Sequence, residues 1–217
     1  MNYPKSIQKL IDLFSKFPTV GPRTAARFVF YLMTAKNEEI EELLKSITDF
    51  RKIIKLCSFC FKPFEPAQIS SKIEAGKAET KICEICASSL RDKTQLAIIE
   101  KETDLFFLEK TRKYKGLYFI LGGTVSHLKE AEIKKLRINE LLDRVQNPQK
   151  FGVKVDFKEI ILAINPTTEG EATTLYLERK LKPLGKKISR LGRGLPTGAE
   201  LEYADEETIE SALEGRK

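Results

Sequence analysis

The first 55 or so residues carry the apolar periodicity of α-helices. In the segment 4–16, apolar residues recur at spacings of three, four and seven, which places them on one helical face. A turn rich in proline and glycine at 17–22 separates this segment from a second periodic one at 23–33. A third segment at 37–55 has acidic residues early and basic residues late, an order that complements the helix dipole. The pattern predicts a small all-helical unit.

Further along the chain the pattern changes to short apolar or alternating runs separated by helical stretches. Four runs have the length and composition of strands, at 96–100, 116–121, 159–164 and 186–191. Helical stretches lie near 103–113, 136–146 and 170–181, and another follows at 204–214. This alternation predicts an α/β layer with a mostly parallel sheet.

Composition narrows the class of partner. The 217 residues include 41% hydrophobic side chains, enough for a substantial core, and carry a net charge of +7 with an isoelectric point near 9.1. The positive balance favours anionic partners, with nucleic acid as the first candidate. No apolar run approaches the roughly 18 residues of a membrane span, and no signal-peptide core opens the chain. With paired, reduced cysteines, these features predict a cytoplasmic protein without membrane partners.

Four cysteines form two matched pairs, Cys57 with Cys60 and Cys83 with Cys86, and the chain contains no other cysteine. Two CxxC motifs are typical of one tetrahedral zinc site with four cysteine ligands, because each two-residue spacer lets two thiolates reach the same ion. Two redox or disulfide pairs, or four buried thiols, are the alternatives. Four thiolates close the coordination shell to substrate. The motif therefore predicts one structural Zn²⁺ per chain and does not by itself name a function.

The turn at 17–22 is the second informative feature. A tight glycine-containing turn presents backbone N–H groups to a phosphate, and the following helix adds its positive amino-terminal dipole. Arg23 and Arg27 are one helical turn apart and lie on one face. A helix-hairpin-helix usually has glycine at both ends of the turn, whereas Thr19 occupies the first position here. An ordinary αα-hairpin with two solvated arginines is the alternative.

Charge is segregated towards the end of the chain. A basic run, opposed only by Glu178, either lines a path for nucleic acid or forms a solvated face. Its members are Arg179, Lys180, Lys182, Lys186, Lys187, Arg190 and Arg193. Acidic residues dominate from Glu200 to Glu214, which indicates either subunit contacts or a solvated surface.

The segment 165–173 follows a predicted strand and opens a helix, the position at which α/β proteins place their sites. Glu169 and Glu171 are suited to hold Mg²⁺ or meet a partner protein; alternatively, they only favour the helix dipole. His127 is the single histidine and has no nucleophile or carboxylate motif beside it, so we expect it to have a surface role. The glycine-rich stretch 192–198 matches neither a dinucleotide-binding nor a P-loop motif and is interpreted as a bend.

Three stretches, together with the cysteine pairs, resemble the bacterial recombination mediator family RecR. They are the run from Gly116 to Gly123, the segment 161–185 and the segment 194–216. The resemblance covers nearly the whole chain and implies an α+β multidomain protein. Its expected parts are a helix-hairpin-helix at 1–56, a four-cysteine zinc finger at 57–90, a Toprim-like α/β domain at 91–192 with a mostly parallel sheet, and a short C-terminal helical element at 193–217.

The resemblance implies a non-enzymatic DNA-binding clamp in recombinational repair. Members of the family assemble into ring-like homo-oligomers, dimers or tetramers, and cooperate with RecO and RecF to load RecA at single-stranded gaps. On this pattern Arg23 and Arg27 face single- or double-stranded DNA, and Glu100 matches the Toprim glutamate. Glu169 and Glu171 fall in the segment used for partner contact, or for a residual Mg²⁺ site. The implied location is the bacterial cytoplasm, in association with the nucleoid.

The chain departs from the family pattern at three places. The spacer between the cysteine pairs has 22 residues and is much longer than usual. Residues 126–130 replace a Ser-Pro-Leu loop, and Gly192-Arg193-Gly194 replaces Ala-His-Gly. These departures leave the roles of the three loops open.

A further comparison bears on catalysis. Catalytic Toprim domains resemble one another in pairing a glutamate with Asp-x-Asp, and the three carboxylates bind Mg²⁺. Here Asn165-Pro166-Thr167 stands where Asp-x-Asp is expected, and neutral Asn and Thr are poor Mg²⁺ ligands. The substitution argues against catalysis. The alternatives are a Mg²⁺-dependent Toprim nuclease or topoisomerase-like enzyme, and a simple monomeric zinc-containing DNA-binding module.

Overall fold

The computed structural model describes residues 3–66, 81–125, 130–192, 194–195, 197–198 and 200–215. The chain forms two compact units, residues 1–54 and 55–217. The long spacer between the cysteine pairs, the loop with His127, and Arg193 fall largely or wholly outside the described residues, so the expectations about them stay predictions.

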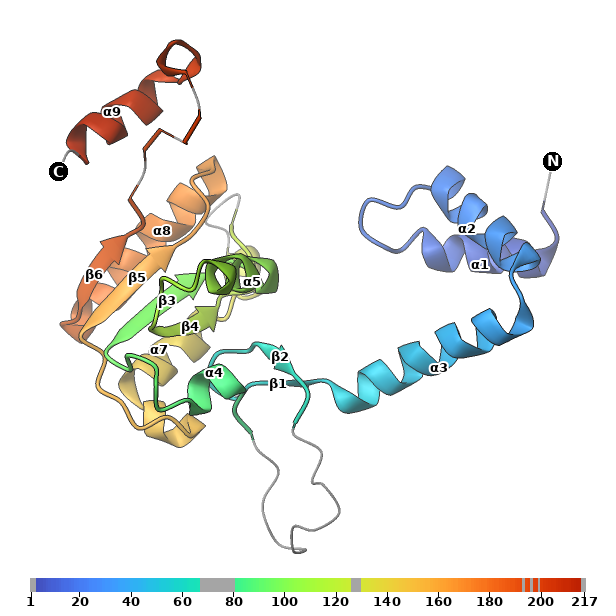
Figure 1. Ribbon diagram of the computed structural model, residues 1–217, viewed down its shortest axis with the longest axis horizontal. Coiled ribbons are helices and arrows are strands. Elements are labelled where there is room, and N and C mark those ends of the chain that lie inside the picture. Colours follow the sequence, from blue (N-terminus) through green and yellow to red (C-terminus); the bar gives the residue numbers. More distant parts are fainter. Residues whose placement is uncertain are drawn as a thin grey trace, which may run out of the picture. The chain divides into compact units, whose positions relative to one another are not determined.

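The N-terminal unit consists of three helices with a small core (Figure 1). They are α1 (Lys5–Phe14), α2 (Pro22–Thr34) and α3 (Asn37–Ile53). In α1 and α2, the buried side chains are Ile11, Ala25 and Val29, and the predicted apolar stripe of the first helix supplies one of them. Helix α3 buries none of its residues. The predicted all-helical unit is therefore confirmed, but most of its apolar surface is exposed in a single chain.

Backbone strain marks the turn between α1 and α2. Thr19 has a φ of 64°, in the left-handed region that favours glycine. A β-branched residue there is a genuine outlier, at a cost of about 1–2 kcal/mol. This is the position at which the sequence has threonine in place of the usual glycine. The turn keeps its hairpin conformation despite the substitution, and Ala25 N–H donates to the Gly21 carbonyl at 2.9 Å as α2 begins.

A four-stranded parallel sheet organises the second unit. The strand order is β4-β3-β5-β6, which Figure 1 shows across the sheet. The strands are β3 (Gln95–Ile99), β4 (Leu117–Ile120), β5 (Glu159–Ala163) and β6 (Lys187–Arg190). All of β4 and most of β3 are buried, as expected for continuous apolar runs covered on both faces. The predicted strands and the parallel sheet are confirmed.

Helices connect the strands as predicted. They are α5 (Glu102–Thr111), α7 (Ile138–Gln146) and α8 (Thr168–Leu181), and the final helix is α9 (Glu206–Glu214). The structure adds the short α6 (Glu130–Ile133) and the 3-10 turns Pro148–Phe151, Lys182–Leu184 and Leu201–Tyr203. Elements of three or four residues are too short to carry a periodic signal in sequence. Among the described helices, none has the length and apolar content needed to cross a membrane.

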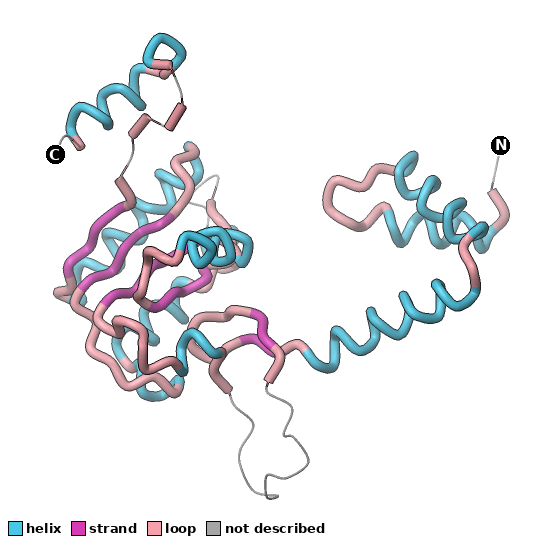
Figure 2. The backbone as a smooth tube through the Cα atoms, viewed as in Figure 1, coloured by secondary structure: helices cyan, strands magenta, loops and turns pink. Residues whose placement is uncertain are grey.

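The cysteine-containing segment packs directly on the sheet. A two-stranded hairpin, β1 (Lys55–Leu56) with β2 (Pro63–Phe64), carries the first pair, and α4 (Glu84–Ala87) carries the second (Figure 2). All four cysteines belong to the same buried cluster as the strand residues. Phe61 meets Phe119 of β4 edge-on with ring centroids 5.6 Å apart, and the Ile120 N–H donates to the Cys60 carbonyl at 3.0 Å. The hairpin thus extends the core beyond strand β4.

Candidate functional site

The four cysteine sulfurs converge on one point. Cys57, Cys60, Cys83 and Cys86 are all buried, and their sulfur atoms lie within 4.8 Å of one another. The Sγ atoms of Cys60 and Cys83 are 3.6 Å apart. A tetrahedral ion with Zn–S bonds of about 2.3 Å would hold its ligands roughly 3.8 Å apart. The donor set and its spacing therefore fit a metal ion, as the sequence motif predicted.

Backbone amides and one arginine hold the cluster in place. The Lys62 N–H donates to Cys60 Sγ at 3.4 Å, and the Cys83 N–H donates to Cys57 Sγ at 3.3 Å. Arg144 of α7 is buried and donates to the Ser58 carbonyl at 3.1 Å. Its guanidinium also lies over the ring of Phe61, 4.4 Å from the centroid, and this stacking joins the sheet layer to the first knuckle. Sequence reasoning missed Arg144, because nothing local distinguishes it from a surface arginine.

The pKa shifts of the four thiols indicate that the cluster favours binding of a cation. Hydrogen bonding with Cys57 raises the pKa of Cys60 and of Cys86, while the bond with Cys60 lowers the pKa of Cys57. Four adjacent thiolates repel one another unless a positive charge lies between them. A dication that binds all four sulfurs removes this conflict and displaces the protons.

The second candidate site is the carboxyl edge of the sheet, where β3, β4 and β5 end. Glu100 follows β3, and Asn165 follows β5. The Asn165 amide donates to a Glu100 carboxylate oxygen at 2.7 Å, and the Gly122 N–H donates to the Glu100 carbonyl at 2.9 Å. Asn165 stands where catalytic Toprim domains have an aspartate. Its side-chain amide therefore engages the Glu100 carboxylate in a hydrogen bond. An aspartate at position 165 would instead repel Glu100 in the absence of a cation.

Gly170 brings the end of β5 and the start of α8 close together. A Cβ at this position would lie 1.9 Å from the Asn165 carbonyl oxygen, so no larger residue fits without a backbone shift. The Gly170 N–H also donates to the Thr167 hydroxyl, which caps α8 at 3.1 Å. The sequence signal for this role is a glycine in the first turn of a helix, where it has no other evident benefit.

The structure separates the remaining predicted acidic residues. Glu169 is exposed in the first turn of α8, whereas Glu171 is half-buried and lies 3.1 Å from Arg190, which also pairs with Glu178. Within the described parts of the chain, the only set of three or more Cys, His, Asp or Glu ligand atoms close enough to share a metal is the cysteine cluster. The geometry therefore does not gather Glu100, Glu169 and Glu171 around a common ion.

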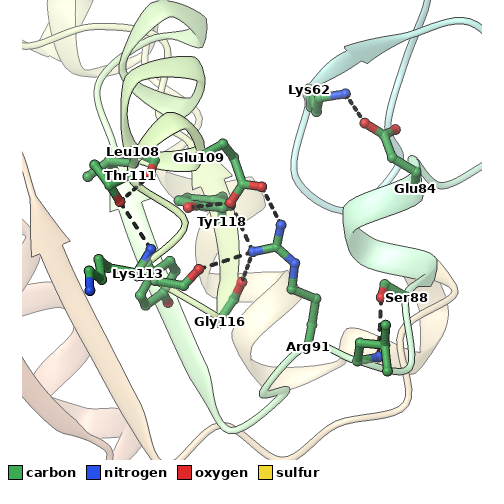
Figure 3. A network of polar contacts seen from close by, with 12 residues as sticks. Lys62, Glu84, Ser88, Arg91, Leu108, Glu109, Thr111, Lys113, Gly116 and Tyr118 are labelled. Atoms are coloured by element: carbon green, nitrogen blue, oxygen red, sulfur yellow. Dashed lines mark hydrogen bonds and ion pairs between the residues drawn. The ribbon is translucent and has the colours of Figure 1, made fainter.

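A partly buried polar network ties the segment after the second cysteine pair to the sheet (Figure 3). Arg91 forms a bidentate ion pair with Glu109 of α5, and the Tyr118 hydroxyl donates to the same carboxylate at 2.6 Å. Burial acts to raise the pKa of Glu109, but hydrogen bonds from Arg91 and Tyr118 outweigh it, so the pKa is lowered. Arg91 also reaches the carbonyls of Tyr114 and Gly116 at 3.4 Å. Sequence reasoning did not predict this network, because its members are far apart along the chain.

The arginines of the hairpin lie where the sequence placed them. Arg23 and Arg27 are both exposed on the first turns of α2, and Gly21 and Pro22 stand at the start of this helix. No side chain caps the amino end of α2, so its first N–H groups are available to a ligand. Phosphate binding by this turn stays a prediction, for which the uncapped helix start and the two exposed arginines supply donors.

Comparison with known proteins assigns a family to three stretches of the chain and to the chain as a whole. Family models for the RecR helix-hairpin-helix, the Toprim domain and the RecR C-terminal region match residues 7–51, 94–192 and 194–217. A recombination protein RecR from Bifidobacterium longum subsp. infantis is 37% identical over 215 residues, which cover 99% of this chain and 97% of that protein. The chain belongs to the RecR family.

Membership confirms the family predicted from sequence, together with the overall fold class. It supports a role in recombinational DNA repair. It also supports DNA binding by the helix-hairpin-helix.

Proposed function

We propose that this RecR-family protein is a non-enzymatic DNA clamp that assists RecO and RecF in loading RecA at single-stranded gaps. The N-terminal unit carries the proposal. Its hairpin presents Arg23 and Arg27 beside the free amino end of α2, and its helices expose the apolar surface that a ring assembly needs. One small unit thus combines a phosphate-binding feature with a self-association surface.

The case for DNA contact rests on exposure. Neither Arg23 nor Arg27 belongs to any ion pair within the described residues, so both guanidinium groups are free to meet phosphates. Backbone contacts of this kind do not read sequence. We therefore propose binding to single- and double-stranded DNA without base specificity.

The case for a homo-oligomer, dimer or tetramer, rests on α3. Four large apolar side chains form a stripe along it: Leu43, Leu44, Ile47 and Phe50. Leu44 is 60% exposed and Phe50 is 62% exposed in the single chain. An exposed stripe of this size marks an interaction surface, because soluble monomers rarely leave such contiguous apolar area in water. A second copy of the same helix is the simplest partner.

The case against catalysis rests on Asn165. A Toprim enzyme needs several carboxylates around Mg²⁺, and here an amide occupies one of those positions and donates to Glu100. We propose that Glu100, Glu169 and Glu171 serve partner contact instead, with RecO and RecF as the partners. We further propose that the four cysteines hold one structural Zn²⁺ and that the protein acts in the cytoplasm, at the nucleoid.

Fluorescence anisotropy with labelled single- and double-stranded oligonucleotides tests the clamp over a range of salt concentrations. For the duplex, replacing Arg23 and Arg27 by glutamine should lower the salt slope by about 2, since each lost phosphate contact removes about 0.9. The matched control is Lys45→Gln with Lys52→Gln, which removes two exposed charges from α3 of the same unit. An unchanged slope in the arginine variant would place DNA elsewhere.

The enzymatic alternative has its own readout. Supercoiled plasmid is incubated with the protein and Mg²⁺ at low salt, and half of each sample is deproteinised before electrophoresis. We expect a mobility shift that disappears on deproteinisation with plasmid topology unchanged. Nicked or relaxed plasmid would overturn the non-enzymatic assignment.

A further inference from the structure

The amino edge of the parallel sheet, opposite the edge that carries Glu100 and Asn165, concentrates positive charge. In a parallel sheet all loops that enter the strands lie at one edge, and binding sites ordinarily occupy the other. The strand arrowheads in Figure 1 mark the carboxyl ends, so these loops lie at the tails. We define the amino-edge patch as the exposed side chains Arg112, Lys113, Lys115, Lys154, Lys158 and Lys182.

Backbone contacts place these loops side by side. The Asp92 N–H donates to the Lys115 carbonyl at 2.8 Å, and the Lys158 N–H donates to the Thr94 carbonyl at 2.8 Å. The Lys187 N–H donates in turn to the Lys158 carbonyl at 3.1 Å. Four strands spaced about 4.8 Å apart span roughly 14 Å, so charges far apart in sequence share one short edge. The basic run near the end of the chain contributes Lys182, whereas its Arg190 is paired with Glu178.

Charge at this edge is not neutralised from within. Two carboxylates there already have partners, Asp156 with Lys186 at 2.6 Å and Glu159 with Lys187 at 2.9 Å. Within the described part of the chain, none of the six patch residues forms an ion pair. Lys158 lies close enough to Asp92 and Asp156 to lower the pKa of both carboxyls, and Lys115 acts in the same way on Glu109, so these acids offset part of the charge without forming ion pairs with the patch.

The loop that carries half of the patch is held rigidly. Arg91 donates hydrogen bonds to the carbonyls of Tyr114 and Gly116, and Figure 3 shows the contact with Gly116. A Cβ on Gly116 would lie 2.9 Å from the Gln95 carbonyl oxygen. Arg112 has a φ of 56°, a left-handed conformation in which glycine would be less strained by about 1 kcal/mol. An arginine is present at this position despite that cost, which is expected if its charge has a use.

We propose that the amino-edge patch is a second surface for the DNA backbone, separate from the hairpin. The inference rests on the proposed function only in taking DNA as the ligand. Duplex DNA carries one negative charge per about 1.7 Å of helix axis, so a duplex lying along an edge of roughly 14 Å carries about eight phosphate charges over that length, of which those on the near side face the edge. Five of the six residues are lysines, which are depleted in the cores of protein–protein interfaces but suited to phosphate contact. This balance favours DNA over an acidic segment of a second chain.

The test replaces Arg112, Lys113, Lys115 and Lys158 by glutamine in the full-length protein. Binding to a fluorescein-labelled 40-base-pair duplex is measured by anisotropy between about 50 and 200 mM salt. We expect a loss of at least tenfold in affinity at the lower salt and a slope smaller by about 2–4. Light scattering on the same samples reports the oligomeric mass, and circular dichroism confirms folding.

Two controls isolate the position of the charges. One removes four exposed lysines elsewhere, Lys45, Lys52, Lys134 and Lys135, and should leave affinity within about twofold once long-range charge is screened. The other changes the three patch lysines Lys113, Lys115 and Lys158 to arginine and should keep the slope.

A patch variant with the wild-type slope overturns the inference while leaving the hairpin proposal intact. A patch variant that changes mass with the slope unchanged overturns it in favour of a protein contact. If the wild-type protein itself does not bind the duplex, the proposed clamp and this inference fail together.

Discussion

The two units of this chain differ in how much apolar surface they bury. The unit from Lys55 onwards has a continuous buried cluster that includes the cysteines, residues from three strands of the parallel sheet and parts of four helices. The N-terminal unit buries only Ile11, Ala25 and Val29 among its described residues, and α3 buries none. The N-terminal unit therefore has a much smaller core than the sheet unit.

The difference predicts that the stability of the fold depends mainly on the sheet unit and that self-assembly depends on the N-terminal unit. The sheet unit buries all of β4 together with four cysteines whose spacing fits a metal ion. A unit with a stripe of exposed leucine, isoleucine and phenylalanine gains most of its burial only when another surface covers it. Perturbations of the two units should therefore have different signatures, unfolding in one and dissociation in the other.

The largest effect is expected in the cysteine cluster. Cys57→Ala should remove the metal and leave the chain insoluble or unfolded, because structural zinc contributes about 10–16 kcal/mol of apparent binding energy, more than the net stability of most domains. Metal content by mass spectrometry and urea unfolding measure it. Ser88→Ala, outside the cluster, is the control. A soluble, metal-free and cooperatively folding Cys57 variant would contradict a structural metal.

The second-largest effect is expected on the oligomeric mass, from charges placed in the N-terminal unit. Leu44→Glu with Ile47→Glu places two charges on the apolar stripe and should reduce the mass in light scattering towards the 24.7 kDa monomer. The thermal unfolding of the sheet unit should change little. Ser46→Glu with Thr48→Glu adds the same charge to exposed polar positions of the same helix. Equal masses for the two variants would show that the stripe is not the assembly surface.

The third-largest effect is expected from breaking the partly buried ion pair of Arg91 and Glu109. Arg91→Met leaves the carboxylate without its cation and should destabilise the sheet unit by roughly 2 kcal/mol at pH 7, less than a fully buried pair because Glu109 is partly solvated. The measurement is urea unfolding, with Arg112→Met as a control at an exposed arginine.

The pH dependence of this effect has a definite sign. The folded pKa of Glu109 lies below its ordinary value, which is about 4.3 in an unfolded chain. The stabilisation is therefore complete above about pH 4.3 and declines as the pH falls through the folded pKa. The difference between wild type and Arg91→Met should therefore shrink as the pH falls below about 4.3. The Arg112 control shows the pH effects common to all chains, including thiolate protonation.

The smallest effect is a gain in the N-terminal turn. Thr19→Gly relieves a left-handed β-branched residue and should stabilise the α1–α2 pair by roughly 0.5–1 kcal/mol after the entropy of glycine is deducted. Hydrogen exchange of the α1 and α2 amides in the whole chain measures it. Ser6→Gly, in a helical conformation, should instead accelerate exchange. A faster-exchanging Thr19→Gly would mean that the threonine serves the turn in a way that outweighs its strain.

Much of the architecture was predictable because its signals are local. The periodic segments became α1, α2, α3 and α8, and the apolar runs became the four parallel strands, since side-chain spacing alone distinguishes the two geometries. The cysteine pairs predicted the metal-binding cluster from spacing in the same way. The position of Thr19 was evident from its contrast with the usual glycine.

Contacts between distant segments were not predictable. Arg144 reaches Ser58 and Arg91 reaches Glu109, across 86 and 18 positions of sequence respectively. Nothing near any of these residues indicates its partner. Gly170 was likewise missed, because the close approach that requires it exists only after β5 and α8 have folded together.

The sequence by itself determined the family and the helices and strands, and it predicted the cysteine cluster and the basic hairpin, because each depends on residues that are neighbours or regularly spaced. Only the tertiary structure decided that the knuckles share a core with the sheet. It also decided that Asn165 donates a hydrogen bond to Glu100 and that backbone hydrogen bonds link the separate loops that carry lysines at the amino edge. The physical reason is that chain folding brings together groups whose interaction energy depends on distance in space, which the order of residues does not record.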